Sequence, residues 1–124
     1  MNPHSLLDAL FARHRYARLD ASNLEAFVRR PGEALLFFAA DPERLRETLD
    51  LAVILPELVN SRGGPLRVGV LETPFAEQRA PAYRLRRFPA LVFLRAGVFL
   101  GAIEGLRDWS DYRRLVQDLL AVPV

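Results

Sequence analysis

A run of seven apolar residues, Ala34–Ala40, constrains the fold of this chain more than any other feature of its sequence. Gly32 and the pair Asp41-Pro42 stand on either side of the run, and both are typical of breaks in regular structure. The run has the length of a strand, and it does not alternate with polar residues. It therefore predicts a strand that is covered on both faces, as in a sheet between two helical layers. A second run of this kind is expected at Leu66–Leu71.

The segments around these strands have helical or hairpin patterns. Helices are expected over residues 5–16, from Asp20 to Pro31-Gly32, from Asp41-Pro42, from Thr73-Pro74 with an interruption at Pro81, and from Asp108 onward. Residues 90–95 and 98–103 predict an antiparallel hairpin, and a short strand is expected near residues 16–19. Parallel strands that alternate with helices, followed by a hairpin and a closing helix, predict an α/β sandwich with a mixed sheet.

Residues 51–60 admit two interpretations. The apolar residues 51–55 alone have the length of a strand. The pattern continues to Asn60, however, which favours a helix that Pro56 would kink.

Length and composition exclude several classes of protein. A chain of 124 residues, 51% of them hydrophobic, predicts one domain over residues 1–124 with a substantial core. There is no cysteine, so disulfides and thiol chemistry are excluded. The basic residues are all arginine, and a net charge of +2 does not indicate a nucleic-acid partner. No apolar run approaches the ~20 residues that span a bilayer, and no signal peptide is visible, so we expect a cytoplasmic protein without membrane insertion.

One segment carries a resemblance to a known fold family. The sequence APAYRLRRFP at residues 80–89 resembles the thioredoxin pattern that leads into the cis-proline of that family. Phe37-Phe38-Ala39 resembles the aromatic pair and alanine that precede the thioredoxin active-site loop, and Leu91–Leu94 followed by Gly97 resembles its last hairpin. The resemblance covers residues 17–120. It implies a thioredoxin-like three-layer sandwich, with a mixed sheet of four or five strands flanked by helices.

Two departures from thioredoxin concern its chemistry. The chain lacks the active-site cysteines, and Leu36 stands where thioredoxins have a buried aspartate. A buried proton relay is useful only where a thiol is titrated nearby. Because the cysteines and the buried aspartate are both absent, we predict a thioredoxin-like scaffold that has kept the fold without the redox reaction.

A narrower family shares these departures. The sequences DPER at residues 41–44, LAVILPEL at 51–58, RFPALVF at 87–93 and GLRDW at 105–109 are similar to the cysteine-free hydrogenase accessory proteins of the HyaE and HupG type. The resemblance implies a chaperone in nickel–iron hydrogenase maturation. Its implied partner is the hydrogenase small-subunit precursor, held by the twin-arginine signal peptide before export, with other hydrogenase accessory proteins as further candidates.

Six residues are candidates for binding such a partner: Asp41, Glu43, Glu47, Glu57, Phe88 and Pro89. Carboxylates suit the planar guanidinium groups of paired arginines. The strand entry at Phe88-Pro89 offers an apolar surface and a backbone that an extended peptide could pair with. A structural role is the alternative for each residue, because acids belong at helix starts and an aromatic before a strand commonly packs in the core.

Other polar residues do not form a catalytic or metal-binding set. His4 and His14 lie ten positions apart on one predicted helix and do not share a face, so no metal site or cofactor is expected. No nucleophile, base and acid are spaced as a catalytic group, and we predict that the chain is not an enzyme. The alternative function is a general protein-interaction or assembly module, for instance a homodimer through the apolar last helix.

Two further features have structural explanations. Trp109 is expected to pack on the sheet while Asp108 caps the last helix. Arg84, Arg86 and Arg87 form the densest basic cluster and predict a solvated face or a protein contact.

Overall fold

The apolar run of residues 34–40 forms most of β2 (Glu33–Phe38), the central strand of a five-stranded sheet. The structure is a computed structural model that describes residues 3–123. Strand order is β1-β3-β2-β4-β5. β2 pairs in parallel with β3 (Arg67–Leu71) and antiparallel with β4 (Ala90–Arg95), so the sheet is mixed as predicted.

The two outer strands complete the sheet. β1 (Ala17–Arg18) is short and runs parallel to β3, which agrees with the predicted short strand. β5 (Val98–Glu104) forms the predicted antiparallel hairpin with β4, with an irregularity at Phe93 and Leu94. One edge of the sheet therefore belongs to β1 and the other to β5.

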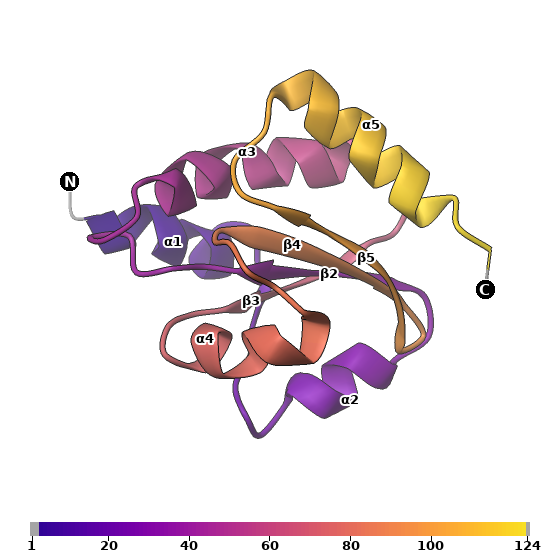
Figure 1. The fold of residues 1–124 in the computed structure, drawn as a ribbon, viewed down its shortest axis with the longest axis horizontal. Helices are drawn as coiled ribbons and strands as arrows, with labels where there is room; N and C mark the ends of the chain where they lie inside the picture. Colours follow the sequence, from indigo (N-terminus) through magenta and orange to yellow (C-terminus); the bar gives the residue numbers. More distant parts are fainter. Residues whose placement is uncertain (1–2, 124) are drawn as a thin grey trace.

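Helices cover both faces of this sheet (Figure 1). One layer contains α1 (Pro3–Ala12), α3 (Glu47–Ser61) and α5 (Trp109–Leu120). The other contains α2 (Leu24–Arg29), α4 (Phe75–Arg79) and a 3-10 turn (Ala80–Tyr83) that begins where Pro81 was expected to interrupt the helix. The predicted three-layer α/β sandwich is confirmed. None of these helices has the length and apolar character that would let it cross a membrane.

The side chains of β2 divide the core into two halves. Leu35 and Phe37 belong to the cluster beneath α1, α3 and α5, whereas Leu36 and Phe38 belong to the cluster beneath α2 and α4. All four are fully buried. A strand with apolar side chains on both faces can be stable only between two covering layers, which is why the run lacks alternation.

The segment after β2 differs from the prediction in its first part. Asp41-Pro42 does not begin a helix, because residues 41–46 form turns and α3 begins at Glu47. The Asp41 Oδ1 atom accepts a hydrogen bond from the Glu43 backbone N–H at 3.0 Å, a local turn that Asp favours as readily as a helix cap. From Glu47 the helix is continuous with Pro56 inside it, so the helical interpretation of residues 51–60 is confirmed and the strand interpretation is wrong.

Two other helix boundaries are shifted. α1 ends at Ala12, short of the predicted residue 16. α2 begins at Leu24, because the Asp20 carboxylate accepts a hydrogen bond from the Ser22 N–H at 2.8 Å and forms a turn first.

The start of α5 corrects the expectation for Trp109. Asp108 precedes the helix as predicted, but its side chain makes no capping hydrogen bond. The Trp109 side chain is 39% exposed, whereas Tyr112, one turn later, is fully buried. The Tyr112 hydroxyl donates to the Gly105 carbonyl just after β5 ends, so Tyr112 and not Trp109 occupies the buried position at the start of α5.

Candidate partner-binding site at one end of the sheet

Three segments meet where β2 ends, β4 begins and β5 ends. Phe38 pairs with Ala90, and Ala90 pairs with Glu104. The Gly105 N–H then donates to the Pro89 carbonyl at 2.8 Å. We call this region the Pro89 end of the sheet and define it as residues 39–47, 88–89 and 105–109.

Phe88 and Pro89 occupy the middle of this region. Their peptide bond is cis, as the thioredoxin resemblance implied. Pro89 is buried, whereas Phe88 is half-buried and its ring lies edge-on to that of Phe38, with 6.4 Å between the centroids. Phe88 therefore packs against the core and also presents part of its ring to solvent.

Three of the four predicted carboxylates lie at this end. Asp41 is half-buried in the loop after β2, Glu43 is exposed on the same loop, and Glu47 is exposed at the first position of α3. Glu57 lies ten positions further along α3, which at 1.5 Å per residue is about 15 Å from Glu47 along the helix axis. The structure therefore gathers three acids near Pro89 and separates the fourth from them.

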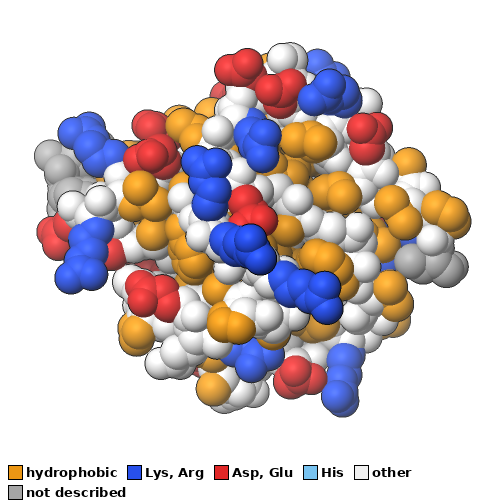
Figure 2. Space-filling model, viewed as in Figure 1, with side chains coloured by type: hydrophobic (Ala, Val, Ile, Leu, Met, Phe, Trp, Pro, Cys, Tyr) orange, Lys and Arg blue, Asp and Glu red, His pale blue; other side chains and the backbone are white. Residues whose placement is uncertain are grey.

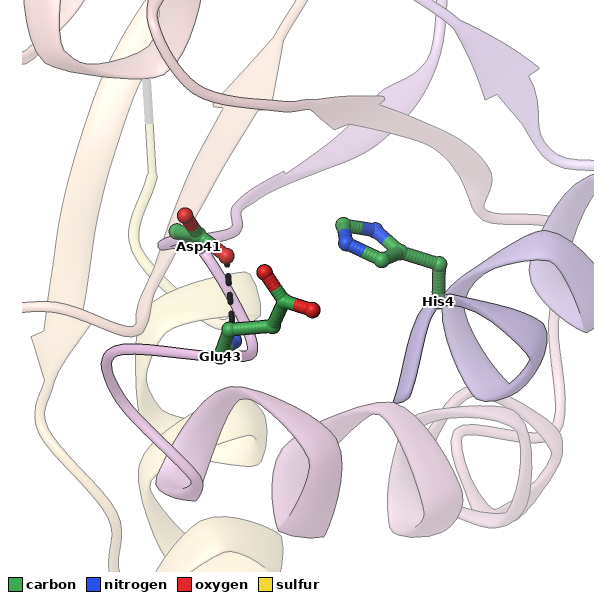
Figure 3. Close-up of side chains that lie close together, drawn as sticks. All are labelled: His4, Asp41 and Glu43. Atoms are coloured by element: carbon green, nitrogen blue, oxygen red, sulfur yellow. Dashed lines mark hydrogen bonds between the residues drawn. The ribbon is translucent and has the colours of Figure 1, made fainter. Parts of the chain in front are cut away.

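His4 joins two of these acids. It extends from the first turn of α1 toward the loop after β2, where it faces Asp41 and Glu43 (Figure 3). The potential ligand atoms of the three side chains all lie within 4.8 Å of one another. One imidazole nitrogen and two carboxylate oxygens can coordinate a divalent cation, and the same oxygens can accept hydrogen bonds from a guanidinium group.

The sequence gives no sign of this role for His4, because the spacing between His4 and His14 says nothing about residues distant in the chain. The relevant neighbours are 37 and 39 positions away, and only the packing of α1 beside α3 brings them close. The amphipathic pattern of α1 predicts that it packs against the core, but not which helix it lies beside.

Two exposed apolar side chains complete the site. Leu106 is 41% exposed and Trp109 is 39% exposed, and both follow Gly105, which is bonded to Pro89. Leu106 had no predicted role, and Trp109 was predicted to pack on the sheet. Together with Phe88 they provide an apolar surface at the same end of the sheet as the carboxylates.

The interior beneath the site contains no ionisable side chain where thioredoxins hold one. Leu36 is fully buried opposite Val92 of β4, in the α2 and α4 half of the core. With no cysteine in the chain, the region has no thiol to titrate. The arrangement can bind a partner through acids and apolar groups, but it cannot exchange disulfides.

Fold and site together define a thioredoxin-like protein that has lost thiol chemistry. Solved structures agree on the fold. Human ERp44 in its zinc-bound form superposes with a TM-score of 0.66 at 19% identity, over 83% of this chain and 30% of that one. A chain from the structural study of thiol resolution in yeast mitochondrial 1-Cys peroxiredoxin has a TM-score of 0.68 at 11% identity, over 88% of this chain and 97% of that one. At these identities the likeness concerns the fold alone.

Sequence comparison identifies the family. Residues 6–112 match the family model described as hydrogenase-1 expression protein HyaE. The hydrogenase expression/formation protein HoxO of Cupriavidus necator is 36% identical over 95% of this chain and 74% of its own length. The hydrogenase expression/formation protein HupG of Rhodobacter capsulatus is 35% identical over 95% of this chain and 86% of its own length. The chain belongs to the HyaE family and is a hydrogenase expression/formation protein with a thioredoxin-like fold.

Proposed function

We propose that this protein is a non-enzymatic maturation chaperone, which binds the twin-arginine signal peptide of a nickel–iron hydrogenase small-subunit precursor in the cytoplasm before export. The names of its relatives support a role in hydrogenase formation. The observation that supports this client most directly is the position of the Asp41 and Glu43 carboxylates. They lie at the same end of the sheet as the exposed Leu106 and Trp109.

The proposed recognition has an electrostatic part. A signal peptide of this type carries two adjacent guanidinium groups, each of which can donate two parallel hydrogen bonds to one carboxylate. Asp41 and Glu43 would accept these bonds, because the turn between them holds their backbones in a fixed relation. Glu47 adds negative charge at the start of α3, and Glu57 contributes only to the longer-range attraction of a basic peptide.

The second part of the recognition is apolar. The residues that follow the arginine pair in such a peptide are hydrophobic, and they need a surface that is already partly exposed. Leu106, Trp109 and the exposed part of Phe88 provide one next to Pro89. Burial of such side chains supplies affinity, whereas the carboxylates determine which peptide is accepted.

Calorimetric titration tests the proposal with two synthetic peptides. One carries a small-subunit signal sequence with its arginine pair, and in the other both arginines are replaced by glutamine. We expect the native peptide to bind at least ~10-fold more tightly, because losing charge-assisted hydrogen bonds costs more than the 1.4 kcal/mol of a tenfold change. Equal binding of the two peptides, or binding of neither, would contradict the proposal.

Variants of the chain localise the site. Asp41→Asn with Glu43→Gln should weaken binding of the native peptide by ~10-fold or more, and added salt should reduce the difference. Glu25→Gln with Asp118→Asn removes the same charge from exposed positions on α2 and α5 and should leave binding unchanged. Glu57→Gln alone should have little effect, whereas a large effect would extend the site along α3.

The alternative of a general assembly module makes a different prediction. A homodimer through the last helix would need an apolar outer face on α5. After Trp109, the buried apolar residues of α5 are Tyr112, Val116 and Leu120, whereas Arg113 and Gln117 are exposed on the outer side. A stable dimer in light scattering that buries the Pro89 end and binds no signal peptide would favour the alternative.

A further inference from the structure

The outer edge of β5 is an unpaired strand edge. Within residues 3–123, β5 has a single neighbour in the sheet, β4. Gly105 donates to Pro89 across this pair, so the alternation of an antiparallel ladder turns the backbone groups of Ala102 and Glu104 away from β4. The outward Glu104 carbonyl accepts a hydrogen bond from Arg107 Nε at 3.2 Å, so the backbone groups offered to another chain are those of Ala102 and the Glu104 N–H. Such an edge is a template for another extended chain.

A pocket adjoins the hairpin end of this edge. It has a volume of about 370 Å³ and lies between α2, the 3-10 turn and the β4–β5 hairpin. Its lining includes Val28, Tyr83, Arg84, Leu94 and Phe99. Phe99 is 47% exposed, and its ring lies 5.9 Å from that of Tyr83. The walls of the pocket are partly polar, with Arg84 among them. Its apolar part, formed by Val28, Leu94 and Phe99, can accept one apolar side chain of a strand added to β5.

The other end of the edge is basic. Arg86, Arg87 and Arg107 are exposed around the end of β5, and Arg84 is exposed beside the pocket. Figure 2 shows arginine side chains across the middle of the face in view, with an acidic side chain among them and hydrophobic side chains beside them. The Arg87 guanidinium lies against Gly105, where a Cβ atom would come within 3.4 Å of it.

The acid among these arginines is already engaged. One oxygen of Glu104, Oε1, accepts hydrogen bonds from the backbone N–H groups of Arg86 and Arg87. That carboxylate and the exposed Asp108, which follows Arg107 in the sequence, together offset half of the positive charge of the four arginine side chains. The edge is therefore complementary to a negatively charged segment.

We propose that the outer edge of β5 receives an extended, acidic segment of a partner protein as an additional strand. An apolar side chain of the segment would fill the pocket beside Phe99, and its acidic side chains would lie near Arg86 and Arg107. From Phe99 to Glu104 a strand spans about 17 Å at 3.4 Å per residue, which is the length of five or six residues. This surface is separate from the acidic loop of the proposed function and has the opposite charge preference.

A second copy of the chain fits the edge less well. Antiparallel pairing of two β5 strands would place the pocket end of each copy beside the Glu104 end of the other. Arginines stand at both ends, so like charges would face one another across the contact. An acidic partner has no such repulsion.

Nuclear magnetic resonance titration with a probe peptide tests the proposal. The probe is the acetylated and amidated hexapeptide VTVETE, and its counterpart VTVKTK carries the opposite charge. With VTVETE we expect shifts of the Phe99, Ala102 and Glu104 amide signals and slower hydrogen exchange at Ala102 and Glu104. Shifts confined to other regions, or equal binding of VTVKTK, would overturn the proposal.

A pair of matched variants separates the edge from general charge effects. Arg84→Gln with Arg86→Gln should weaken binding of VTVETE by ~10-fold. Arg13→Gln with Arg15→Gln removes the same charge near the opposite edge of the sheet. This control pair should not change the affinity for VTVETE. Arg15 is a suitable match for Arg84, because their φ angles are +58° and +57°. Equal weakening by both pairs would overturn the proposal.

Two further measurements address other occupants of the edge. A twelve-residue oligothymidylate should leave the β5 signals unchanged. If it bound to β5 more tightly than VTVETE does, the partner of this edge would be a nucleic acid and not a protein. Light scattering should give the mass of a monomer at the concentrations used. A dimer that protects the Ala102 and Glu104 amides would show that the edge pairs with a second copy instead.

Discussion

The Oε1 atom of Glu104 accepts a hydrogen bond from the backbone N–H of Arg87 at 2.9 Å, which ties the end of β5 to the residue before Phe88. The Arg86 N–H donates to the same oxygen at 2.6 Å. This one carboxylate therefore positions the segment that enters β4. It lies between the acidic side of the Pro89 end and the basic edge of β5, so both proposed surfaces depend on its geometry.

Replacement of Glu104 by alanine should destabilise the protein by about 1.5–3 kcal/mol, because two backbone donors lose a charged acceptor. Glu104→Gln keeps an acceptor oxygen in the same place, so its loss of stability should be less than half that of Glu104→Ala. Urea unfolding measures both values. Equal losses for the two variants would show that the charge, and not the pair of backbone hydrogen bonds, is the main contribution.

Much of the fold follows from local patterns in the sequence. The run at residues 34–40 could be stable only as a doubly covered strand, and the structure buries Leu35, Leu36 and Phe37 completely. The hairpin and the helix through Pro56 were also predictable, because each is encoded by its own residues. These elements needed no information about distant parts of the chain.

The site was less predictable because it depends on where elements end in space. Asp41-Pro42 has equal local reasons to begin a turn or a helix, and the structure has the turn. Trp109 has the spacing of a core residue, but Tyr112, one turn later, is the residue that is buried. His4 reaches the acidic loop only through tertiary packing. Periodicity predicts which face of an element is buried and does not predict how far its neighbours extend.

The buried Tyr112 predicts a loss of stability at alkaline pH. Its hydroxyl donates to the Gly105 carbonyl at 3.1 Å, and burial raises the pKa of this hydroxyl above its ordinary value. The unfolded chain then releases the tyrosine proton at a lower pH than the folded chain does. The contribution of Tyr112 to the free energy of unfolding should therefore be constant below pH ~10 and fall as the pH rises above it.

Tyr112→Phe separates the contribution of Tyr112 to the alkaline loss of stability from the contributions of other residues. At neutral pH the variant should lose about 1–2 kcal/mol, because the Gly105 carbonyl keeps no partner in place of the hydroxyl. Above pH ~10 its stability should fall less steeply than that of the parent chain. Some decline should remain, since burial also raises the pKa of Tyr16 and Tyr83. Parallel curves for the two proteins would show that Tyr112 does not contribute to the decline.

Leu36→Asp should be strongly destabilising in this chain. Leu36 is fully buried among apolar residues, and a carboxylate there would have no partner. We expect a loss of about 3–5 kcal/mol at neutral pH. Burial would raise the pKa of the new carboxyl, so the loss should be smaller below the pH ~4 at which an unfolded aspartate is protonated. Leu36→Met is the control and should cost less than ~1.5 kcal/mol.

Thr48 predicts a stabilising substitution. Its side chain is fully buried near the start of α3, and its Oγ1 atom has no hydrogen-bond partner among the described residues. A buried hydroxyl without a partner costs about 1–3 kcal/mol. Thr48→Val keeps the shape of the side chain and should raise the free energy of unfolding by about 1 kcal/mol. Thr48→Ser keeps the hydroxyl and should not raise the free energy of unfolding. If Thr48→Val lowered it, the hydroxyl would have a partner.

Trp109 gives the proposed signal-peptide site an optical probe of its own. It is the only tryptophan in the chain, and its side chain is 39% exposed at the Pro89 end. A peptide that covers Leu106 and Trp109 removes water from the indole, so its emission should shift to shorter wavelength during titration with the arginine-pair peptide. The glutamine peptide should cause a smaller shift at the same concentration, and VTVETE, which is proposed to bind along β5, should cause little. Calorimetric binding of the arginine-pair peptide without a change in emission would place the apolar contact away from Trp109. The apolar part of the proposed site would then be wrong even if the carboxylates bind the arginines.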